Sequence, residues 1–509
     1  MFSKSTILAF AASLLAANAS REQIANYEPY SEVTDHNALD LDQEEMEVQL
    51  AIGNDEAFFN AQQIYIDGGH SKSVAQVRLT APLQVNVLKG TEMLGNTPSG
   101  NQVKLLAYDD NVAGSQYMKI QYMPSESQKN YVLCRVGASL DPMTKGCLAN
   151  TGVVIIDPAG DAIEIGYEYD LTKDNVNKRT IQRFSTGAKK RMYDCDDCPQ
   201  NYFKQFYDYY GEFDYGNQIV MAAFDGGATN LRNFNSDFSM YKYDGREQII
   251  KKGTAFMIVW MYIVYNLEDA VSDCESKCTL QTCNDDIGAH SWDMAVAFYT
   301  GMLEGDNGQG SGKFPYALAD KRCGNFNTCG ENGNRVSGTS KVNLEINRNF
   351  KSGLAKFLQG DCEAVKGHKD VIINLMKIPL IQGTLRYAWK TDNEAYSEKA
   401  EAEGAIFAMS IAPMVATCNA AAGQVLEDNL QVGQNGSANF KEVKAALESV
   451  YDCLGVDPCM VGGLWDQASQ SYLMDAEPPK ECKGGPSAAP SNTASVGVAT
   501  LAAALAFVL

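Results

Sequence analysis

The 509-residue chain is poor in histidine and in positive charge, and each of these scarcities excludes a class of binding site. It has four histidines, so a metal site built mainly from histidine is excluded and any metal must take mostly oxygen or sulfur ligands. Its 63 acidic residues outnumber its 42 basic residues, which gives a net charge of −21. Phosphate contacts need a basic face, so this balance argues against a nucleic-acid partner and favours a protein that attracts cations.

Familiar catalytic motifs are also missing. Neither His-Glu-x-x-His nor Gly-x-Ser-x-Gly occurs in the chain. Residues 308–313 resemble a phosphate-binding loop, but Asn307 stands where the first glycine is required and Phe314 where serine or threonine is required. We therefore expect a binding protein and not an enzyme, with a secreted metalloenzyme as the third choice.

Both ends of the chain carry targeting signals. Residues 1–19 combine Lys4, an apolar run and a small-residue cleavage site, which predicts a secretory signal peptide. A spacer at 476–495 precedes the apolar tail 496–509, which is shorter than the ~20 residues that a spanning helix needs. This arrangement is typical of a GPI-anchor signal, and a short or tilted transmembrane anchor is the alternative. We expect a membrane-anchored protein on the outer cell surface.

Fourteen cysteines lie between positions 134 and 482, and in a secreted protein an even number favours disulfides. Their connectivity does not follow from the sequence, although close spacing suggests four local pairs: Cys134 with Cys147, Cys195 with Cys198, Cys323 with Cys329, and Cys453 with Cys459. Asn435 begins an N-glycosylation sequon.

Hydrophobic patterning predicts an α+β, multidomain chain. Short alternating apolar stretches predict an all-β domain over 48–170, after an extended, acidic lead-in at 20–47. Residues 171–200 are predicted to be a charged linker. Longer apolar segments predict a larger, all-α, disulfide-stapled domain over 201–475.

A weak internal repeat relates three segments of the helical domain: 215–226, 290–301 and 401–412. Their first turns hold six potential oxygen or nitrogen ligands: Asp214, Tyr215, His290, Asp293, Glu401 and Glu403. His290 and Asp293 are three residues apart, so they share one helix face and could bind one ion together.

Phenolate, carboxylate and a single imidazole form a hard ligand set that suits Fe(III). Arg322 or Arg386 could hold an anion through a bidentate guanidinium. The alternative is that these acids are ordinary helix starts that complement the helix dipole, and that both arginines are structural.

Five long segments of the helical half carry a family resemblance: 290–305, 315–330, 378–390, 401–418 and 451–465. They resemble the iron-assimilating, low iron-inducible periplasmic proteins of algae. With the β region and the anchored tail, the whole chain is most similar to the phytotransferrins of diatoms.

The resemblance implies a surface protein that binds ferric iron with carbonate as a synergistic anion and delivers it by endocytosis. A surface reductase or endocytic proteins would be its partners. The matching segments add Tyr299 as a candidate ligand. A rival interpretation is an adhesion or cell-wall structural glycoprotein, which the β domain, disulfides and anchor suit equally well.

Overall fold

The fold is seen in a computed structural model of the chain. It describes residues 23–31, 33–68, 70–71, 75–83, 91–98, 100, 102–107, 117–123, 151–157, 161–169, 179–195, 198–283, 286–434 and 436–483. The predicted signal peptide and anchor, Cys134, Cys147 and Asn435 lie outside these residues. Among the described helices, none combines the length and hydrophobicity of a membrane span.

Six strands form a closed antiparallel barrel in the order β1-β4-β3-β2-β5-β6. Their bounds are β1 (Ala75–Leu79), β2 (Glu92–Asn96), β3 (Gln102–Ala107), β4 (Tyr117–Met123), β5 (Thr151–Ile156) and β6 (Ile163–Tyr169). Every second residue points inward, as in the buried pairs Val103 and Leu105 of β3 and Val154 and Ile156 of β5. The barrel therefore has a small apolar core of its own.

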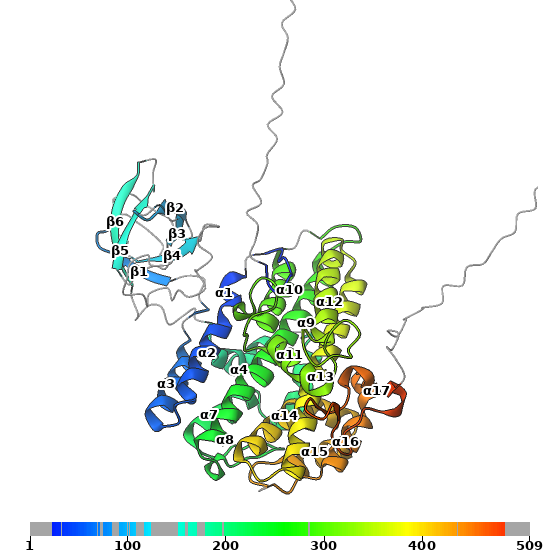
Figure 1. Cartoon of the computed structure of the whole chain (residues 1–509). Coiled ribbons are helices and arrows are strands. Elements are labelled where there is room, and N and C mark those ends of the chain that lie inside the picture. Colours follow the sequence, from blue (N-terminus) through cyan, green and yellow to red (C-terminus); the bar gives the residue numbers. More distant parts are fainter. Residues whose placement is uncertain are drawn as a thin grey trace, which may run out of the picture.

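The rest of the described chain is a large helical body that lies beside the barrel (Figure 1). Its helices are α1 (Thr34–Asn37), α2 (Leu39–Leu50), α3 (Asp55–Asp67), α4 (Ile181–Thr186), α5 (Ala188–Met192), α6 (Asn201–Tyr210), α7 (Tyr215–Asp225), α8 (Tyr243–Gly253), α9 (Trp260–Lys277), α10 (Asp286–Thr300), α11 (Pro315–Phe326), α12 (Lys341–Leu358), α13 (Cys362–Asn393), α14 (Glu398–Cys418), α15 (Ala420–Leu430), α16 (Phe440–Glu448), α17 (Tyr451–Leu454) and α18 (Pro458–Val461). A π-helical turn, Thr254–Val259, joins α8 to α9, and the short hairpin β7 (Trp465–Asp466) and β8 (Ser471–Tyr472) follows α18.

Helix α14 lies at the centre of the body. All residues from 400 to 415 are buried, which is the pattern of a helix covered on every side. It packs against α13, α8 and α15. Mixed α+β structure with a predominantly helical larger part confirms the expected fold class.

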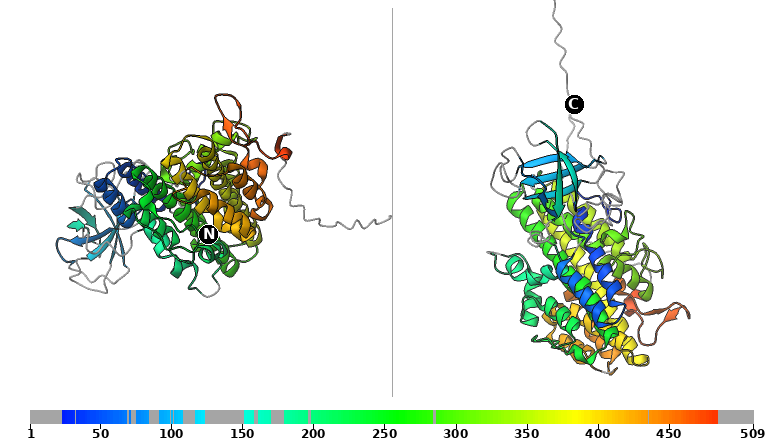
Figure 2. Two further views of the ribbon diagram at one scale, coloured as in Figure 1. Left: turned by 90° about the horizontal axis from the view of Figure 1, so that it is seen from below. Right: turned by 90° about the vertical axis from the view of Figure 1, so that its left-hand side faces the viewer.

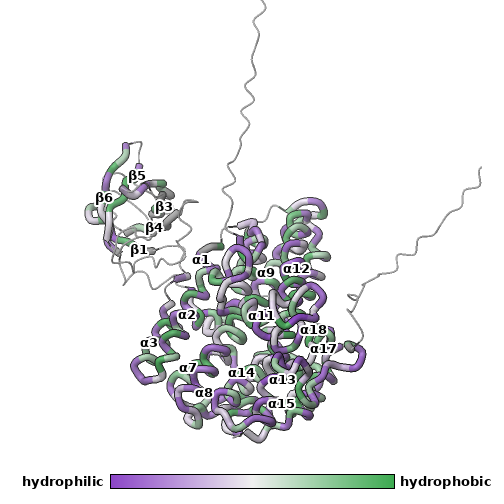
Figure 3. The backbone as a smooth tube through the Cα atoms, viewed as in Figure 1, coloured by the Kyte–Doolittle hydropathy of each residue, from purple (hydrophilic) through white to green (hydrophobic). Residues whose placement is uncertain are grey.

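Residues 34–67, in contrast, differ from the expected extended lead-in and first strands, because they form α1, α2 and α3. These helices pack on the body on the side nearest the barrel (Figures 1 and 2). Hydrophobic and hydrophilic residues interleave along α2 and α3 (Figure 3), and buried Leu39, Met46 and Leu50 belong to the core of the body. The composition of α2 explains the difference: Asp40 and Asp42 are buried together with its apolar side chains, so the sequence shows no clear apolar face that would indicate a helix.

The expected charged linker is also part of the body. Its described residues form α4 and α5, whose apolar side chains Ile181, Phe184 and Met192 are buried in the common core. The barrel is therefore an insertion between α3 and α4. Its two ends lie together, because a Cβ added to Gly68 would be 3.1 Å from the main-chain oxygen of Arg179.

Six disulfides staple the described chain, and two of the suggested local pairs are confirmed, Cys195–Cys198 and Cys323–Cys329. The suggested Cys453–Cys459 pair is wrong, because tertiary packing places Cys453 against the end of α14 and Cys459 against the chain's last described turn. The other four bonds are Cys274–Cys362, Cys278–Cys283, Cys418–Cys453 and Cys459–Cys482.

A buried acid of α2, Asp40, docks this helix on the loop that follows α10. Its carboxylate accepts a hydrogen bond from the main-chain N–H of Leu303 at 2.9 Å, and Gly301, with φ +79°, leaves room for it. The pKa of Asp40 is raised to about 8, mainly by burial; the main-chain hydrogen bonds from Leu303 and Met302 oppose this shift, and the charges of Glu304 and Glu44 contribute to it.

We therefore expect stability to fall as the pH rises from about 4 to about 8, because the folded state binds more protons than the unfolded state across this window. Asp40→Asn should reduce the loss of thermal stability between pH 6 and pH 9. Part of the loss should remain in this variant, because burial also raises the pKa values of Glu268 and Glu304. An unchanged pH profile of the melting temperature in Asp40→Asn would contradict this assignment.

Candidate metal site on helix α10

The predicted pair His290 and Asp293 shares one face of α10, and the N-terminal segment 23–36 covers that face. Asp293 is fully buried and accepts a hydrogen bond from the Tyr27 hydroxyl on Oδ1 at 2.6 Å. Its other oxygen, Oδ2, accepts from the main-chain N–H of Ser31 at 2.6 Å. The carboxylate therefore anchors the N-terminal segment on α10.

Ser31 links this carboxylate to the imidazole of His290. The Ser31 hydroxyl lies 2.8 Å from Oδ2 of Asp293 and 2.9 Å from Nδ1 of His290. An ionised Asp293 can only accept, so the hydroxyl donates to it and accepts from Nδ1–H of His290. This arrangement fixes the tautomer and places the lone pair of His290 on Nε2, the nitrogen that can bind a metal.

A second imidazole, His36, meets the first edge to face, with 5.1 Å between the ring centroids. Nδ1 of His36 lies 2.9 Å from Oδ1 of Asp35, and the other oxygen of Asp35 accepts from Nη1 of Arg179 at 2.6 Å. A carboxylate that holds Nδ1–H directs the ligating lone pair of a neutral histidine to Nε2. Both imidazoles are thus oriented through Nδ1 by an oxygen partner.

Burial and charge set the protonation of the site. Burial, and next the charge of His36, lower the pKa of His290 to about 4. Burial raises the pKa of Asp293 to about 6, although the hydrogen bonds from Tyr27 and Ser31 oppose it. Burial would also raise the pKa of Asp35, but His36 and Arg179 outweigh it and the pKa is lowered. Near pH 7 the site therefore holds a neutral His290 and two carboxylates.

These side chains are of the types that bind iron, although His36, His290 and Asp293 do not form a group of three whose ligand atoms all lie within 4.8 Å of one another. Imidazole nitrogens suit iron among the transition metals, and carboxylate and phenol oxygens suit its harder, ferric state. His290 and His36 would supply nitrogen, and Asp293 and Tyr27 are the nearby oxygen donors. Burial, then Asp293, raise the pKa of Tyr27 well above its usual range, so its hydroxyl stays a neutral donor to the carboxylate.

Tyr299 lies farther along α10, next to this group. Its buried hydroxyl donates to Oδ1 of Asn343 at 2.5 Å, and it lines a small cavity together with Tyr27 and Tyr316. Burial raises its pKa well above the ordinary value, so it too is a neutral phenol. Tyr299 is therefore a neighbour of the site, and its hydroxyl is bonded to Asn343 and not to His290.

Asp214 and Tyr215 have different surroundings. Asp214 caps α7 and accepts hydrogen bonds from the side chains of Asn217 and Gln218. Tyr215 is buried and stacked on Tyr210, and burial raises its pKa. Tyr215 thus belongs to an aromatic layer with Phe206 and Tyr210, and the hydrogen bonds of Asp214 stay within its own helix, α7.

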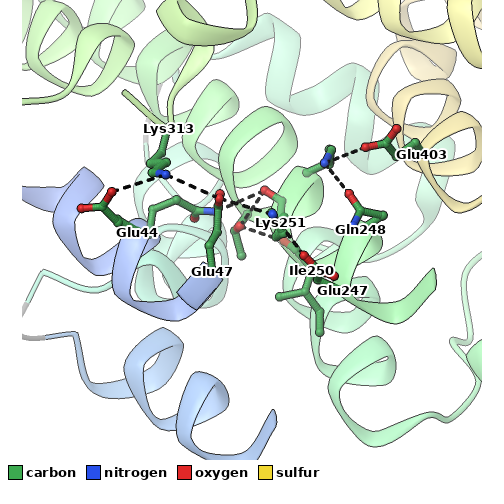
Figure 4. Close-up of polar contacts among 11 residues, drawn as sticks. Glu44, Glu47, Glu247, Gln248, Ile250, Lys251, Lys313 and Glu403 are labelled. Atoms are coloured by element: carbon green, nitrogen blue, oxygen red, sulfur yellow. Dashed lines mark hydrogen bonds and ion pairs between the residues drawn. The ribbon is translucent and has the colours of Figure 1, made fainter. Parts of the chain in front are cut away.

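Glu401 and Glu403 of α14 are also separate from the histidine pair. Glu401 accepts hydrogen bonds from the Tyr241 hydroxyl and from the main-chain N–H of Gly433. Glu403 forms a buried ion pair with Lys252 at 2.9 Å, and Lys252 also donates to Gln248 (Figure 4). A separate group of ion pairs, through Lys251 and Glu47, joins α8 to α2. The predicted convergence of the three helix starts is therefore wrong: each of the three pairs has its own separate partners.

The predicted anion-binding arginines lie near Glu403. Arg322 is buried, with its guanidinium 5.4 Å from the ring of Tyr387 and 5.5 Å from that of Phe407. It donates to Asn325 at 2.9 Å, and Arg386 lies 5.8 Å from the same Tyr387 ring. At the candidate metal site the guanidinium is that of Arg179.

Sequence reasoning therefore missed four residues of the site: Tyr27, Ser31, His36 and Arg179. The first three lie in the segment interpreted as a lead-in, and Arg179 lies in the segment interpreted as a linker. The scarcity of histidine was the available signal, because His36 and His290 are two of only four.

Comparison with known families identifies the family of the chain. The family model described as low iron-inducible periplasmic protein matches residues 201–489, more than half of the chain. The chain belongs to the low iron-inducible periplasmic protein family. Comparisons with curated proteins and with solved structures gave no match. The family match includes His290, Asp293 and Tyr299, whereas Tyr27, Ser31, His36, Arg179 and the barrel lie before it.

Proposed function

We propose that this low iron-inducible protein is phytotransferrin-like: it binds ferric iron at the outer cell surface, with carbonate as a synergistic anion, for uptake by endocytosis. It acts as a carrier and not as an enzyme, and its C-terminal segment anchors it in the membrane. Iron is the cargo, held between the segment 23–36 and α10.

The meeting of His36 and His290 carries this proposal. A chain with four histidines brings two of them within 5.1 Å, each with an oxygen partner on Nδ1, in a family that responds to low iron. Metal-binding histidines generally hold their second ring nitrogen with an oxygen partner in this way. Arg179, which is hydrogen-bonded to Asp35, supplies a positive charge beside the site for the carbonate.

Iron titration of the full-length protein tests this function. We expect one equivalent of Fe(III) to bind at pH 8, more tightly with carbonate than without it. Affinity should fall between pH 8 and pH 5 at constant carbonate, because ligands and anion bind metal only when deprotonated. A visible charge-transfer band would report a tyrosinate ligand. An affinity that does not change with pH would contradict the release mechanism, and a protein that binds no iron would favour the adhesion alternative.

A further inference from the structure

A second group of metal-binding side chains lies where the helical body joins the barrel. It consists of Asp42 and Glu45 of α2 and His70, which follows α3. One ligand atom of each residue lies within 4.8 Å of those of the other two. Nε2 of His70 is 3.2 Å from Oε2 of Glu45, and the main-chain N–H of His70 donates to Oδ1 of Asp42 at 2.9 Å. None of the three belongs to the α10 site.

The fold builds this group from two local features. Asp42 and Glu45 are three residues apart, so they lie on one face of α2. Helix α3 runs back along α2 and ends at Gly68, whose φ of +57° turns the chain toward that face. A Cβ at Gly68 would lie 3.3 Å from Oδ2 of Asp42, so glycine permits the close approach of the chain that carries His70.

The group is enclosed on one side and open on the other. Asp42 is 1% exposed, whereas the side chain of His70 is 14% exposed and that of Glu45 is 38% exposed. A buried carboxylate at the base and two partly exposed ligands above it give an ion a path from solvent. The arrangement is more than a surface cluster of acids, because one member is an imidazole and another is buried.

We propose that Asp42, Glu45 and His70 bind a divalent transition-metal ion, such as Zn²⁺ or Fe²⁺, separately from the ferric site. One imidazole and two carboxylates leave coordination positions for water, and imidazole disfavours Ca²⁺ and Mg²⁺, which prefer oxygen ligands. In the described chain the other close trio, Cys274, Cys278 and Cys362, consists of disulfide-bonded sulfurs and offers no thiolate.

Such an ion would join α2 to the chain that enters the barrel at Ala75, the first residue of β1. It would link the barrel to the body by coordination as well as by the chain itself. The ion pair between His70 and Glu45 is the competing explanation for the same geometry, and the two differ in what metal addition does.

Cobalt titration of the metal-free, full-length protein distinguishes the two explanations, because Co²⁺ replaces Zn²⁺ and reports its ligands through visible absorption. We expect His70→Ala to lose one equivalent of Co²⁺, with an affinity lower by roughly 100-fold or more, and Glu45→Gln to weaken the same equivalent. His368→Ala, which changes a half-buried histidine bonded to Asn349, should keep it. Fe(III) binding should be unchanged in His70→Ala, so the outcome is independent of the ferric site.

An equal Co²⁺ stoichiometry and absorption in the wild type and in His70→Ala would overturn the proposal and leave an ion pair only. Circular dichroism of the metal-free variants provides the check on folding. If His70→Ala is misfolded, Glu45→Gln alone decides, because this partly exposed position tolerates the change of charge.

Discussion

Replacing His290 by alanine is expected to lower the affinity for iron by roughly 100-fold or more while leaving the protein folded. The imidazole is only half-buried, and its removal leaves Asp293 with its hydrogen bonds from Tyr27 and Ser31. The N-terminal segment therefore stays docked on α10 while one ligand is lost. Equilibrium competition against a chelator of known affinity measures the change.

Three further variants make this result specific to the site. His36→Ala should cause a loss of similar size, because the proposed site takes its second nitrogen ligand from this ring, which lies next to His290. Ser31→Ala should cost about 10- to 100-fold, since it removes the group that orients His290 and not a ligand. His368→Ala, the matched control on α13, should bind iron as the wild type does. Wild-type affinity in both His36→Ala and His290→Ala would show that iron binds elsewhere.

Replacing Glu403 by glutamine is expected to destabilise the fold by about 3 kcal/mol or more while leaving iron affinity unchanged. Its carboxylate is the partner of Lys252 at 2.9 Å, and both side chains are largely buried. Burial would raise the pKa of Glu403, but the charge and hydrogen bond of Lys252 outweigh it and the pKa is lowered. Without this acid, Lys252 and the nearby Arg322 keep buried positive charge without compensation.

A surface pair of the same kind provides the control. Glu394 pairs with Lys390 at 2.5 Å, but its side chain is 46% exposed, so Glu394→Gln should cost less than ~1 kcal/mol. Denaturant unfolding compares the two variants, and iron titration accompanies it. Reduced iron affinity in a stable Glu403→Gln protein would contradict this prediction and indicate that Glu403 is an iron ligand.

Much of the helical body could be predicted because its segments are long and apolar. The runs at 371–389 and 404–417 exceed strand length, and they lie in α13 and α14. The helix at 39–50 was harder to predict, because the mean composition of this acidic sequence is that of a solvent-exposed segment. The buried residues of α2 include Asp40, Asp42 and Gln43 as well as its apolar side chains, so hydrophobic periodicity does not identify this helix either.

The candidate site was predictable only in its local part. The three-residue spacing of His290 and Asp293 predicts a shared helix face, and the structure places both there. The approach of His36 and Ser31 to this face is a tertiary contact between distant parts of the chain, which no periodicity encodes. The assumed alignment of three helix starts depended on a weak repeat, and the packing around α14 separates them.

The insertion of the barrel between α3 and α4 has a consequence for how this protein can change over evolutionary time. The chain leaves the body at Gly68 and re-enters it beside that residue, at Arg179. The barrel is thus an inserted domain with adjacent ends, and its loss or replacement would not change the course of the chain through the helical body. The barrel and the helical body can therefore diversify independently, because each has its own apolar core.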